Sequence, residues 1–495
     1  MWKAMLVGVL GLAVAGCGTR PAPVTDAERA AAIDEVAHSL VTQQGIPGVA
    51  IAVLRDGKPF RTVTLGTSDL ATGAPVTTAT PFQLSSTTKL LSSTGVLLLV
   101  ADGKVRLDAG IGDYLDGLPP AWQPVTVRQL LSHTSGLPDI TRATGEIDLV
   151  ADDWAHALPI VAQAPFQFAP GHGWSYTQTN YALLQRLVER VSGTGFEAFL
   201  DQRLFAPLGM DHTFFPGAGH ECATSYKSAA KGTPAPRPEL AFPAYVHAAG
   251  GLCASLDDLA TWSRALEGGT VIPRPLLDAA RTPATLSDGS TAMVGGPISY
   301  GLGRAIDTTP GHRWAGHSGG NSTAYRRYLD DGLTIIVLHN GTHDPDAIAA
   351  AVARAMLQQT AGEGAQADLW DAAVAGDTAA ADTALQAGAD VNALDTRSAR
   401  SGRRPLNWAA LNDNAGMIAW LLAHGADIDA TNTTGFTALH HAAESGSADA
   451  AAALLDAGAD TTLRNAQGET AADVARRKGH EDLARTLATA RPGRR

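Results

Sequence analysis

The last quarter of the chain repeats itself with a period of 33 residues. The string Gly402-Arg-Arg-Pro-Leu-Asn-Trp-Ala-Ala is followed 33 residues later by Gly435-Phe-Thr-Ala-Leu-His-His-Ala-Ala, and after another 33 by Gly468-Glu-Thr-Ala-Ala-Asp-Val-Ala-Arg. A unit of this length cannot bury its own apolar face, so consecutive units must stack on one another. This part of the chain is therefore restricted to a solenoid of similar units.

A second string shows the same repeat in another phase. Its copies are Gly388-Ala-Asp-Val-Asn, Gly425-Ala-Asp-Ile-Asp and Gly458-Ala-Asp-Thr-Thr. The first interval is 37 residues, so about four residues are inserted near 396–401. The period and the residues of the two repeated strings resemble ankyrin repeats. This resemblance implies an all-α ankyrin module over residues 365–490, with roughly four units. His440 and His441 fall on consensus positions, and we expect them to be structural and not metal ligands.

Ankyrin solenoids present a concave face to a ligand, so the resemblance implies a possible protein partner for this module. The alternative is an appendage that only packs against the rest of the chain and stabilises it. Nothing in the sequence identifies a partner.

Charge restricts the other partners. The chain has 495 residues, enough for two or three domains, and its 37 basic and 49 acidic residues give a formal net charge of −12. An acidic surface is repelled by a phosphate backbone and by an anionic membrane surface. We therefore expect no nucleic-acid partner.

The first residues resemble a bacterial lipoprotein signal. Lys3 precedes an apolar stretch, residues 4–15, which is too short for a typical membrane span. It ends in Val14-Ala15-Gly16-Cys17, which resembles a lipobox and implies lipidation of Cys17. Residues 1–17 would then be the signal peptide and 18–27 a tether. The protein would face the periplasm, and we expect its lipid anchor to lie in the outer membrane. An ordinary signal peptide with a chance cysteine is the alternative.

Two further cysteines, Cys222 and Cys253, stay open to two interpretations. Export would place them in an oxidising compartment, where a disulfide between them can form. Two separate buried thiols fit the sequence equally well.

Residues 28–361 combine strand and helix signals. Two pairs of β-rich runs flank Asp-Gly turns, one pair at each end of the region, at 48–54 with 60–65 and at 323–329 with 333–338. Between them lie an apolar helix over 90–101, stopped by Asp102-Gly103, and a loop over 217–243. A last helix is expected over 345–359, with Asp344 as its N-cap. This pattern predicts an α+β domain in which one antiparallel sheet, flanked by helices, is assembled from both ends around a helical insertion.

Ser86-Thr-Thr-Lys89 can carry nucleophilic chemistry. A serine hydroxyl needs a nearby base, and helical spacing puts residues i and i+3 on the same face. Burial can depress the pKa of a lysine until it accepts a proton, and the start of a helix offers backbone N–H groups to an oxyanion.

The motif is weak alone, because Ser228-Ala-Ala-Lys231 matches it too. That copy lies in the predicted loop with no apolar helix behind it, whereas the first copy opens directly into the helix over 90–101. A helix N-cap is the alternative role for Ser86 by itself.

Several blocks in order resemble the serine β-lactamase-related and penicillin-binding-protein-like family, in the branch of class C β-lactamases, D-stereospecific peptidases and esterases. The blocks are Phe82-x-x-x-Ser86-x-x-Lys89, Asp102-Gly-Lys-Val-Arg-Leu-Asp108, Val127-Arg-Gln-Leu-Leu-Ser-His133-Thr-Ser-Gly-Leu-Pro138, Pro170-Gly-x-x-Trp174-Ser-Tyr176-Thr-Gln178-Thr-Asn180, Ala249-Gly-Gly-Leu-Cys253-Ala-Ser255 and His317-Ser318-Gly319. They span roughly residues 41–341.

The resemblance implies a role for each matching residue. Ser86 would form an acyl-enzyme, Lys89 would help to deprotonate it, and Tyr176 would act as general base and pass the proton to the leaving group. The strand with Gly319 would line the site, and the backbone N–H groups of Ser86 and Gly320 would form the oxyanion hole. An ordinary half-buried tyrosine is the alternative for Tyr176.

Two departures from the family pattern concern the substrate. Gln178 stands where the family has Asn, which moves the amide outward by about 1.5 Å; such a misplacement costs about 10²-fold in rate if the amide positions substrate. His317 replaces the lysine of true β-lactamases and would be only partly charged near neutral pH. Arg326 or Arg327 could supply a replacement cation, with at least one of them expected to be solvated surface.

The sequence thus predicts a hydrolase of small esters, amides or D-amino-acid peptides, with β-lactams as a further candidate substrate class. The rival hypothesis is a catalytically weak, ligand-sensing relative whose ankyrin repeats recruit a partner. No metal or cofactor is expected, because no metal-ligand spacing emerges and His220-Glu-Cys222 lies alone in a loop.

Overall fold

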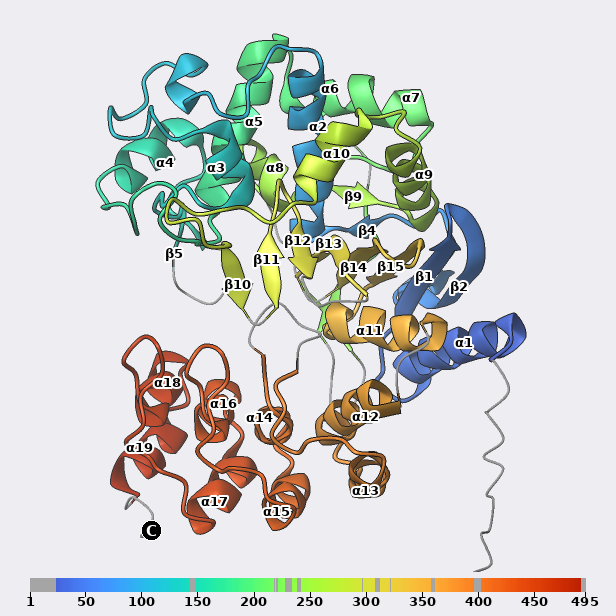
Figure 1. The fold of residues 1–495 in the computed structure, drawn as a ribbon, viewed down its shortest axis with the longest axis vertical. Helices are drawn as coiled ribbons and strands as arrows, with labels where there is room; N and C mark the ends of the chain where they lie inside the picture. The colour runs from blue at the N-terminus through green and yellow to red at the C-terminus, as the bar shows by residue number, and fades with distance from the viewer. Residues whose placement is uncertain are drawn as a thin grey trace, which may run out of the picture.

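The computed structural model describes residues 24–142, 148–217, 219, 221–227, 234–237, 242–295, 297–307, 312–320, 322–357, 361–395 and 402–490. Cys17 and the second Ser-x-x-Lys copy lie outside the described residues. The chain forms an α+β domain around an antiparallel sheet, followed by an all-α stack (Figure 1). Both parts of the predicted fold class are therefore confirmed.

The sheet brings the two ends of the first domain together. Strand β1 (Gly48–Arg55) lies between β2 (Lys58–Asp69) and β15 (Leu333–His339), and Ile51 pairs with a residue on each. The order of the nine strands is β10-β11-β12-β13-β14-β15-β1-β2-β3. The others are β3 (Ala74–Pro75), β10 (Met293–Gly295), β11 (Ile298–Tyr300), β12 (Ala305–Asp307), β13 (Trp314–Gly319) and β14 (Thr323–Tyr328). Both predicted hairpins, β1–β2 and β14–β15, are confirmed.

Short strand pairs lie outside the main sheet. They are β4 (Phe82–Gln83) with β9 (Cys253–Ala254), β5 (Thr141–Arg142) with β6 (Asp148–Leu149), and β7 (Tyr226–Lys227) with β8 (Ala235–Pro236). The last pair interrupts the segment that we expected to be loop throughout.

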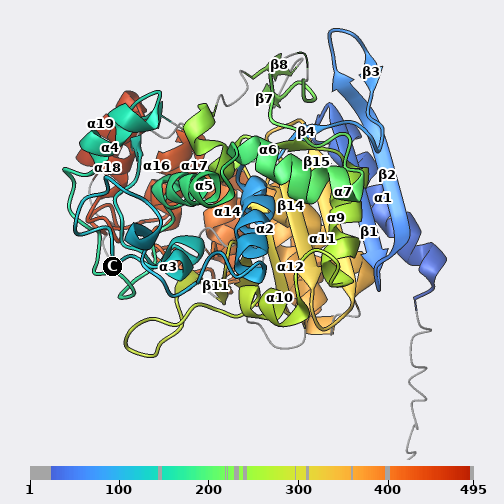
Figure 2. The same cartoon turned by 90° about the horizontal axis from the view of Figure 1, so that it is seen from above.

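Helices cover both faces of the sheet (Figures 1 and 2). Helices α1 (Asp26–Thr42) and α11 (Pro345–Met356) pack on one face, and the helical insertion packs on the other. Side chains of β1 alternate between the two cores, with Val49, Ile51 and Val53 on the α1 side and Ala50, Ala52 and Leu54 on the insertion side. Because both faces are buried, the strand is apolar along its whole length.

Helix α2 (Thr88–Ala101) runs through the centre of the insertion and is buried from Thr88 to Leu99. It begins two residues before the expected start, and a 3₁₀ turn, Ser85–Thr87, precedes it. The surrounding helices are α3 (Val127–Ser132), α4 (Trp154–Val161), α5 (Gln178–Ser192), α6 (Phe196–Leu200), α7 (Ala206–Leu208), α8 (His247–Gly250), α9 (Leu256–Glu267) and α10 (Arg274–Ala280). Shorter turns are the 3₁₀ segments Ile111–Asp113 and Ala244–Val246 and the π turn Asp201–Phe205.

Helix α11 starts as predicted, with the Asp344 side chain accepting the N–H of Asp346, but it ends at Met356 and not at residue 359. Leu357 is already extended. The guanidinium of Arg29, on α1, donates to the carbonyl of Met356 and satisfies one of the last carbonyls of the helix.

The described part of the C-terminal stack consists of four helix pairs. These are α12 (Ala361–Ala375) with α13 (Thr378–Gln386), α14 (Pro405–Leu411) with α15 (Ala415–Ala423), α16 (Ala438–Ser445) with α17 (Ala448–Asp456), and α18 (Ala471–Arg477) with α19 (Glu481–Thr489). Helix α12 begins before residue 365, where we expected the module to start. His440 is buried and contacts the carbonyl of Glu469 in the next repeat, while His441 contacts Asn432 and Glu444. The prediction that both histidines are structural is confirmed.

Candidate active site

Ser86 lies at the turn that joins β4 to α2. The N–H of Leu84 donates to the carbonyl of Leu252 at 2.8 Å, which extends the pairing of β4 with β9 up to the turn. Ser85 then adopts a φ of 46°, a left-handed conformation that residues other than glycine rarely adopt. The chain therefore reverses direction sharply, and half-buried Ser86 lines a cavity at the start of α2.

Strand β14 holds this turn in place. The Thr323 hydroxyl donates to the carbonyl of Leu84 at 3.0 Å, and it lies 2.9 Å from the hydroxyl of Thr87. All three residues are buried. The nucleophile segment is thus fixed by residues 236 or more positions away in the sequence.

Lys89 is fully buried beside Ser86. Its Nζ atom lies 3.5 Å from Ser86 Oγ, 2.9 Å from Gln178 Oε1 and 2.6 Å from the carbonyl oxygen of Ala249. The i, i+3 relation expected from the sequence therefore does bring the amine to the hydroxyl, although Ser86 itself lies on the 3₁₀ turn.

Burial lowers the pKa of Lys89 to about 7, against an opposing effect of the Asp139 carboxylate. A neutral amine has two N–H donors and one lone pair. The carbonyl oxygens of Gln178 and Ala249 accept those two donors, which leaves the lone pair for the hydroxyl of Ser86. The arrangement suits a lysine that accepts the proton of the serine.

Gln178 is the first residue of α5 and supports Lys89. Its side-chain carbonyl accepts from the lysine, and its backbone N–H donates to the carboxylate of Asp139 at 2.9 Å. The glutamine amide, set further out than an asparagine amide would be, reaches the amine directly. A contact between Gln178 and substrate stays a prediction.

Tyr176 lies against both Lys89 and His133. The Lys89 Nζ atom is 4.8 Å from the centroid of the Tyr176 ring, and the His133 ring centroid is 4.3 Å away. Tyr176 lines the same cavity as Ser86, and its hydroxyl is buried. The structure therefore places Ser86, Lys89 and Tyr176 together, as the resemblance implied.

His133 caps α3 with a φ of 59° and is completely buried. Its Nδ1 atom accepts from the backbone N–H of Thr177 at 3.3 Å and is 3.0 Å from Asn180 Nδ2, so the ring proton lies on Nε2. Burial, with smaller effects of Lys89 and His317, holds the pKa of His133 well below its usual range. A neutral imidazole is thus fixed against the ring of Tyr176.

The third motif lies on β13, next to the nucleophile. His317 donates through Nδ1 to the carbonyl of Ser318 at 2.7 Å, and its Nε2 atom lies 2.9 Å from the hydroxyl of Tyr300. A Cβ on Gly319 would lie 1.8 Å from the carbonyl oxygen of Leu84, so only glycine permits this contact. Gly320 has a φ of 54°. The turn after β13 and the segment before Ser86 are therefore neighbours, as the predicted oxyanion hole requires.

Arg326 does lie in the cavity, but it is paired. Its guanidinium contacts the carboxylate of Asp346 and lies 2.8 Å from the hydroxyl of Ser318, with both ionic side chains at most 4% exposed. The guanidinium also lies 3.8 Å from the centroid of the Trp314 ring.

The prediction that one of the two arginines is solvated surface is wrong. The side chain of Arg327 is only 14% exposed and pairs with Glu267 at 3.2 Å, on the opposite face of β14. Alternation does send the two side chains to opposite faces, but the insertion helices cover the second face as well, so Arg327 is half-buried there with a counter-ion.

The cavity has a volume of about 320 Å³. Its lining consists of Ser86, Trp174, Tyr176, Val294, Tyr300, Ala305, His317, Ser318, Arg326 and Asp346. Sequence reasoning assigned no role to Trp174, Tyr300 or Asp346. Trp174 lay inside a recognised block and could have been found, whereas no local signal marks Tyr300 or Asp346.

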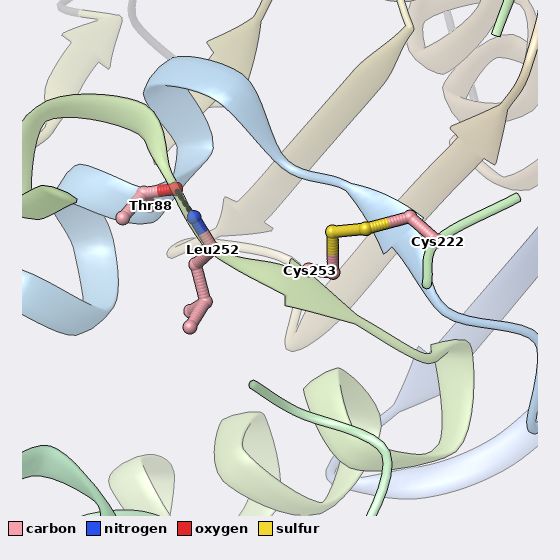
Figure 3. Close-up of a disulfide and its surroundings, with 4 residues drawn as sticks. All are labelled: Thr88, Cys222, Leu252 and Cys253. Carbon is pink, nitrogen blue, oxygen red and sulfur yellow. Dashed lines mark hydrogen bonds between the residues drawn. A yellow bond between two sulfur atoms is a disulfide. The ribbon is translucent and has the colours of Figure 1, made fainter. Parts of the chain in front are cut away.

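A disulfide joins Cys222 to Cys253, so of the two interpretations the paired one is found (Figure 3). Cys253 lies on β9, next to Leu252, whose N–H donates to the Thr88 hydroxyl at 3.3 Å. The bond therefore attaches a surface segment to the strand pair that precedes the nucleophile.

Within the described residues, none of the helices combines the length and the apolar character needed to span a bilayer. The same residues hold no group of three or more His, Cys, Asp or Glu side chains arranged to bind a metal ion.

Comparisons with known proteins match each part of the chain separately. A family model described as beta-lactamase matches residues 33–361, and one described as ankyrin repeats (3 copies) matches residues 369–465. Penicillin-binding protein 4* of Bacillus subtilis is 29% identical over 303 residues, which are 57% of this chain and 65% of that protein. Esterase EstB of Burkholderia gladioli is 30% identical over 64% of this chain and 92% of its own length.

A solved structure, the crystal structure of SurE, superimposes with a TM-score of 0.57 at 29% identity, over 67% of this chain and 76% of that one. The chain thus spans slightly less than two thirds of the penicillin-binding relative and most of the esterase.

Proposed function

The chain belongs to the beta-lactamase family and carries ankyrin repeats at its C-terminal end, and from that premise we propose that it is a serine hydrolase acting through an acyl-enzyme. Its substrates are small esters, amides or D-amino-acid peptides. One observation carries the proposal: a buried lysine with a pKa of about 7 is oriented by two carbonyl oxygens towards a serine hydroxyl 3.5 Å away, at the edge of a cavity.

In the proposed reaction, neutral Lys89 takes the proton of Ser86 as Oγ forms a bond to the substrate carbonyl carbon. The backbone N–H groups of Ser86 and Gly320 stabilise the oxyanion. Tyr176 donates a proton to the leaving alcohol or amine as its bond to the carbonyl carbon breaks, and it takes up in exchange the proton that Lys89 received from Ser86. Water then gives a proton to the same groups and attacks the acyl carbon; the bond between this carbon and Ser86 Oγ breaks, the carboxylic acid leaves, and the proton returns to Oγ.

The charges in the cavity favour esters and uncharged acyl groups. Among the described lining residues, Arg326 is neutralised by Asp346, and His317 stands in the place of the lysine of true β-lactamases. A substrate carboxylate would therefore meet little compensating charge. The aromatic rings of Trp174, Tyr176 and Tyr300 suit an apolar acyl group. The similarity to a protein named esterase EstB supports the same preference for ester substrates.

The test compares residues 18–495 with the Ser86→Ala variant. Turnover of p-nitrophenyl esters, D-alanyl peptides and a chromogenic cephalosporin is measured beside labelling by a fluorophosphonate. Loss of the nucleophile lowers kcat of a serine hydrolase by about 10⁶-fold, so labelling and ester turnover are expected to vanish in the variant. We expect esters to be the fastest substrates and the cephalosporin the slowest.

The second Ser-x-x-Lys copy supplies a matched control. Ser228→Ala is expected to leave labelling and turnover unchanged. Equal activity in wild type and Ser86→Ala, or activity in neither, would contradict the hydrolase and favour the ligand-sensing alternative.

We also propose that the protein is lipid-anchored through Cys17 and faces the periplasm. The support is the lipobox-like string before Cys17 and the apolar stretch ahead of it. Metabolic labelling with a radioactive fatty acid should mark the wild type and not Cys17→Ser. Equal labelling, or none, would favour the ordinary signal peptide.

The ankyrin module is proposed to bind a protein partner, as solenoids commonly do. Among the described residues, an ion pair between Arg354 of α11 and Asp371 of α12 connects the module to the hydrolase domain. A chain that ends at residue 361 separates the two roles. If folding and ester turnover persist while partner binding is lost, the module recruits a partner protein. A large drop in the free energy of unfolding would show instead that the module stabilises the hydrolase domain.

A further inference from the structure

A second cavity, of about 310 Å³, lies behind the catalytic sheet, between the ends of α9 and α10 and the far ends of β13 and β14. Arg327 of β14 lines it, while the preceding residue, Arg326, lines the catalytic cavity on the other face of the strand. The catalytic residues contribute nothing to its lining among the described residues.

The inner wall of this cavity has more positive than negative charge. Arg281 and Arg327 share a single carboxylate, that of Glu267. Arg281 Nη1 lies 3.3 Å and Arg327 Nε 3.2 Å from Glu267 Oε2, and the three side chains are between 6% and 14% exposed. Arg304 is not among the described lining residues, but it is buried and near enough to Arg281 and Glu267 to interact with their charges. The two guanidinium groups of the wall and that of Arg304 behind it are thus opposed by one carboxylate, a surplus of two positive charges.

The pKa values of Glu267 and Arg304 are both shifted in the direction expected beside a surplus of positive charge. Burial raises the pKa of Glu267, but the hydrogen bond and charge of Arg281 and the charge of Arg327 outweigh it, so that the net pKa is lowered. Burial, together with the neighbouring Arg281, lowers the pKa of Arg304 to about 10. At neutral pH Glu267 is therefore charged.

Several of the guanidinium N–H groups are also unsatisfied. Arg281 Nε, Arg327 Nη1 and Arg304 Nη2 are buried and have no hydrogen-bond partner among the described residues. An unsatisfied buried donor destabilises the fold, and more so when it is charged. Arg281 and Arg327 thus bring unsatisfied donors to the wall of the cavity, and Arg304 adds uncompensated charge behind them.

The rim is balanced, in contrast. Arg274 pairs with Asp278 at 3.0 Å, and Arg313 pairs with Asp330 at 2.6 Å; all four side chains are more exposed than those of the inner wall. The surplus is therefore confined to the interior, where solvent screens it least.

We propose that this cavity binds a small dianionic oxyanion, inorganic phosphate or a phosphate monoester. A dianion matches the surplus of two charges, whereas a single carboxylate would leave one uncompensated. The planar guanidinium forks of Arg281 and Arg327 suit the several oxygens of a phosphoryl group. The site is independent of the proposed hydrolase activity, because none of its described lining residues lines the catalytic cavity.

Isothermal titration calorimetry of the full chain tests the proposal, with inorganic phosphate or glycerol 1-phosphate as probes at constant ionic strength set with sodium chloride. We expect saturable binding at one site. Tighter binding of phosphate identifies the free anion as the ligand, and tighter binding of the ester identifies a phosphorylated metabolite. Removal of a charged hydrogen-bond donor in Arg327→Gln should weaken binding about 10- to 100-fold.

Three further variants serve as controls. Arg190→Gln removes an exposed arginine paired with Asp116 and should not change the affinity. Ser86→Ala should also keep it, which distinguishes this cavity from the catalytic one. Arg327→Lys keeps the charge without the fork and should bind with intermediate affinity, even if Arg327→Gln does not fold. Affinity unchanged in both Arg327 variants, or heat that follows ionic strength and not phosphate, would overturn the proposal.

Discussion

The two domains bury their polar side chains in different ways. In the ankyrin stack, His440 contacts Thr437 within its own repeat and the carbonyl of Glu469 in the next one. His441 likewise contacts Asn432 and Glu444. Each buried ring thus has a protein partner on both nitrogens, and these bonds connect one repeat to another.

In the hydrolase domain, some buried polar groups lack such completion. His133 Nε2 and Arg281 Nε have no hydrogen-bond partner among the described residues, and Lys89 has lost part of its preference for the charged state. Unsatisfied or uncharged groups of this kind reduce stability, and proteins often keep them at functional sites. The comparison indicates that the buried histidines of the ankyrin stack support its structure. The incompletely bonded groups near the two cavities can still accept a proton or bind a ligand.

After loss of the nucleophile itself, the largest effect is expected for Lys89→Met. Without a base for Ser86, kcat on p-nitrophenyl esters should fall about 10²- to 10⁴-fold, while removal of a buried amine leaves the domain folded. Steady-state kinetics and circular dichroism measure the two quantities. Lys104→Met, an exposed lysine in the loop after α2, is the control. A decrease of less than tenfold would mean that another group is the base.

Gly319→Ala should reduce kcat by about 10²- to 10³-fold, the size of a lost oxyanion donor. The added Cβ meets the carbonyl oxygen of Leu84, so β13 must move away from the nucleophile turn. Gly195→Ala, where a Cβ meets nothing within 4 Å, is the matched control and should be nearly neutral. Equal kinetics for the two variants would disprove the close approach of β13.

The pH profile should show a rising limb near pH 7. Below that value Lys89 is protonated and cannot accept the proton of Ser86, so kcat/KM should fall about tenfold per pH unit on the acid side. Above it the rate should level off. Ester turnover between pH 5 and 9 measures the limb. A limb near pH 10, the usual value for lysine, would contradict the depressed pKa of Lys89.

The smallest effect belongs to the ankyrin stack. Thr437 caps α16 and contacts His440, so Thr437→Ala should lower the free energy of unfolding of the stack by about 1 kcal/mol, without any change in kcat. Urea denaturation measures the difference. Thr431→Ala, exposed in the same repeat, should have no effect on either quantity. A change in kcat in Thr437→Ala would show that the two domains are energetically coupled.

Much of the fold could be predicted because its signals are local. The Asp56-Gly57 turn, the Asp344 cap and the 33-residue period each depend on a few neighbouring residues, and all three are found. The wrong interpretation of Arg327 has the opposite origin. Alternation along a strand assigns the face of a side chain, but only the packing of other helices decides whether that face is buried.

By itself, the sequence determined the two-domain organisation, the family and the candidate catalytic residues, since motifs and periods are properties of short segments. Only the tertiary structure decided the electrostatics: that Lys89 is buried and near neutral, that Asp346 neutralises Arg326, and that Arg281 and Arg327 share one carboxylate. Burial and pairing depend on residues far apart in the chain, and the desolvation that shifts a pKa exists only after those residues have packed together.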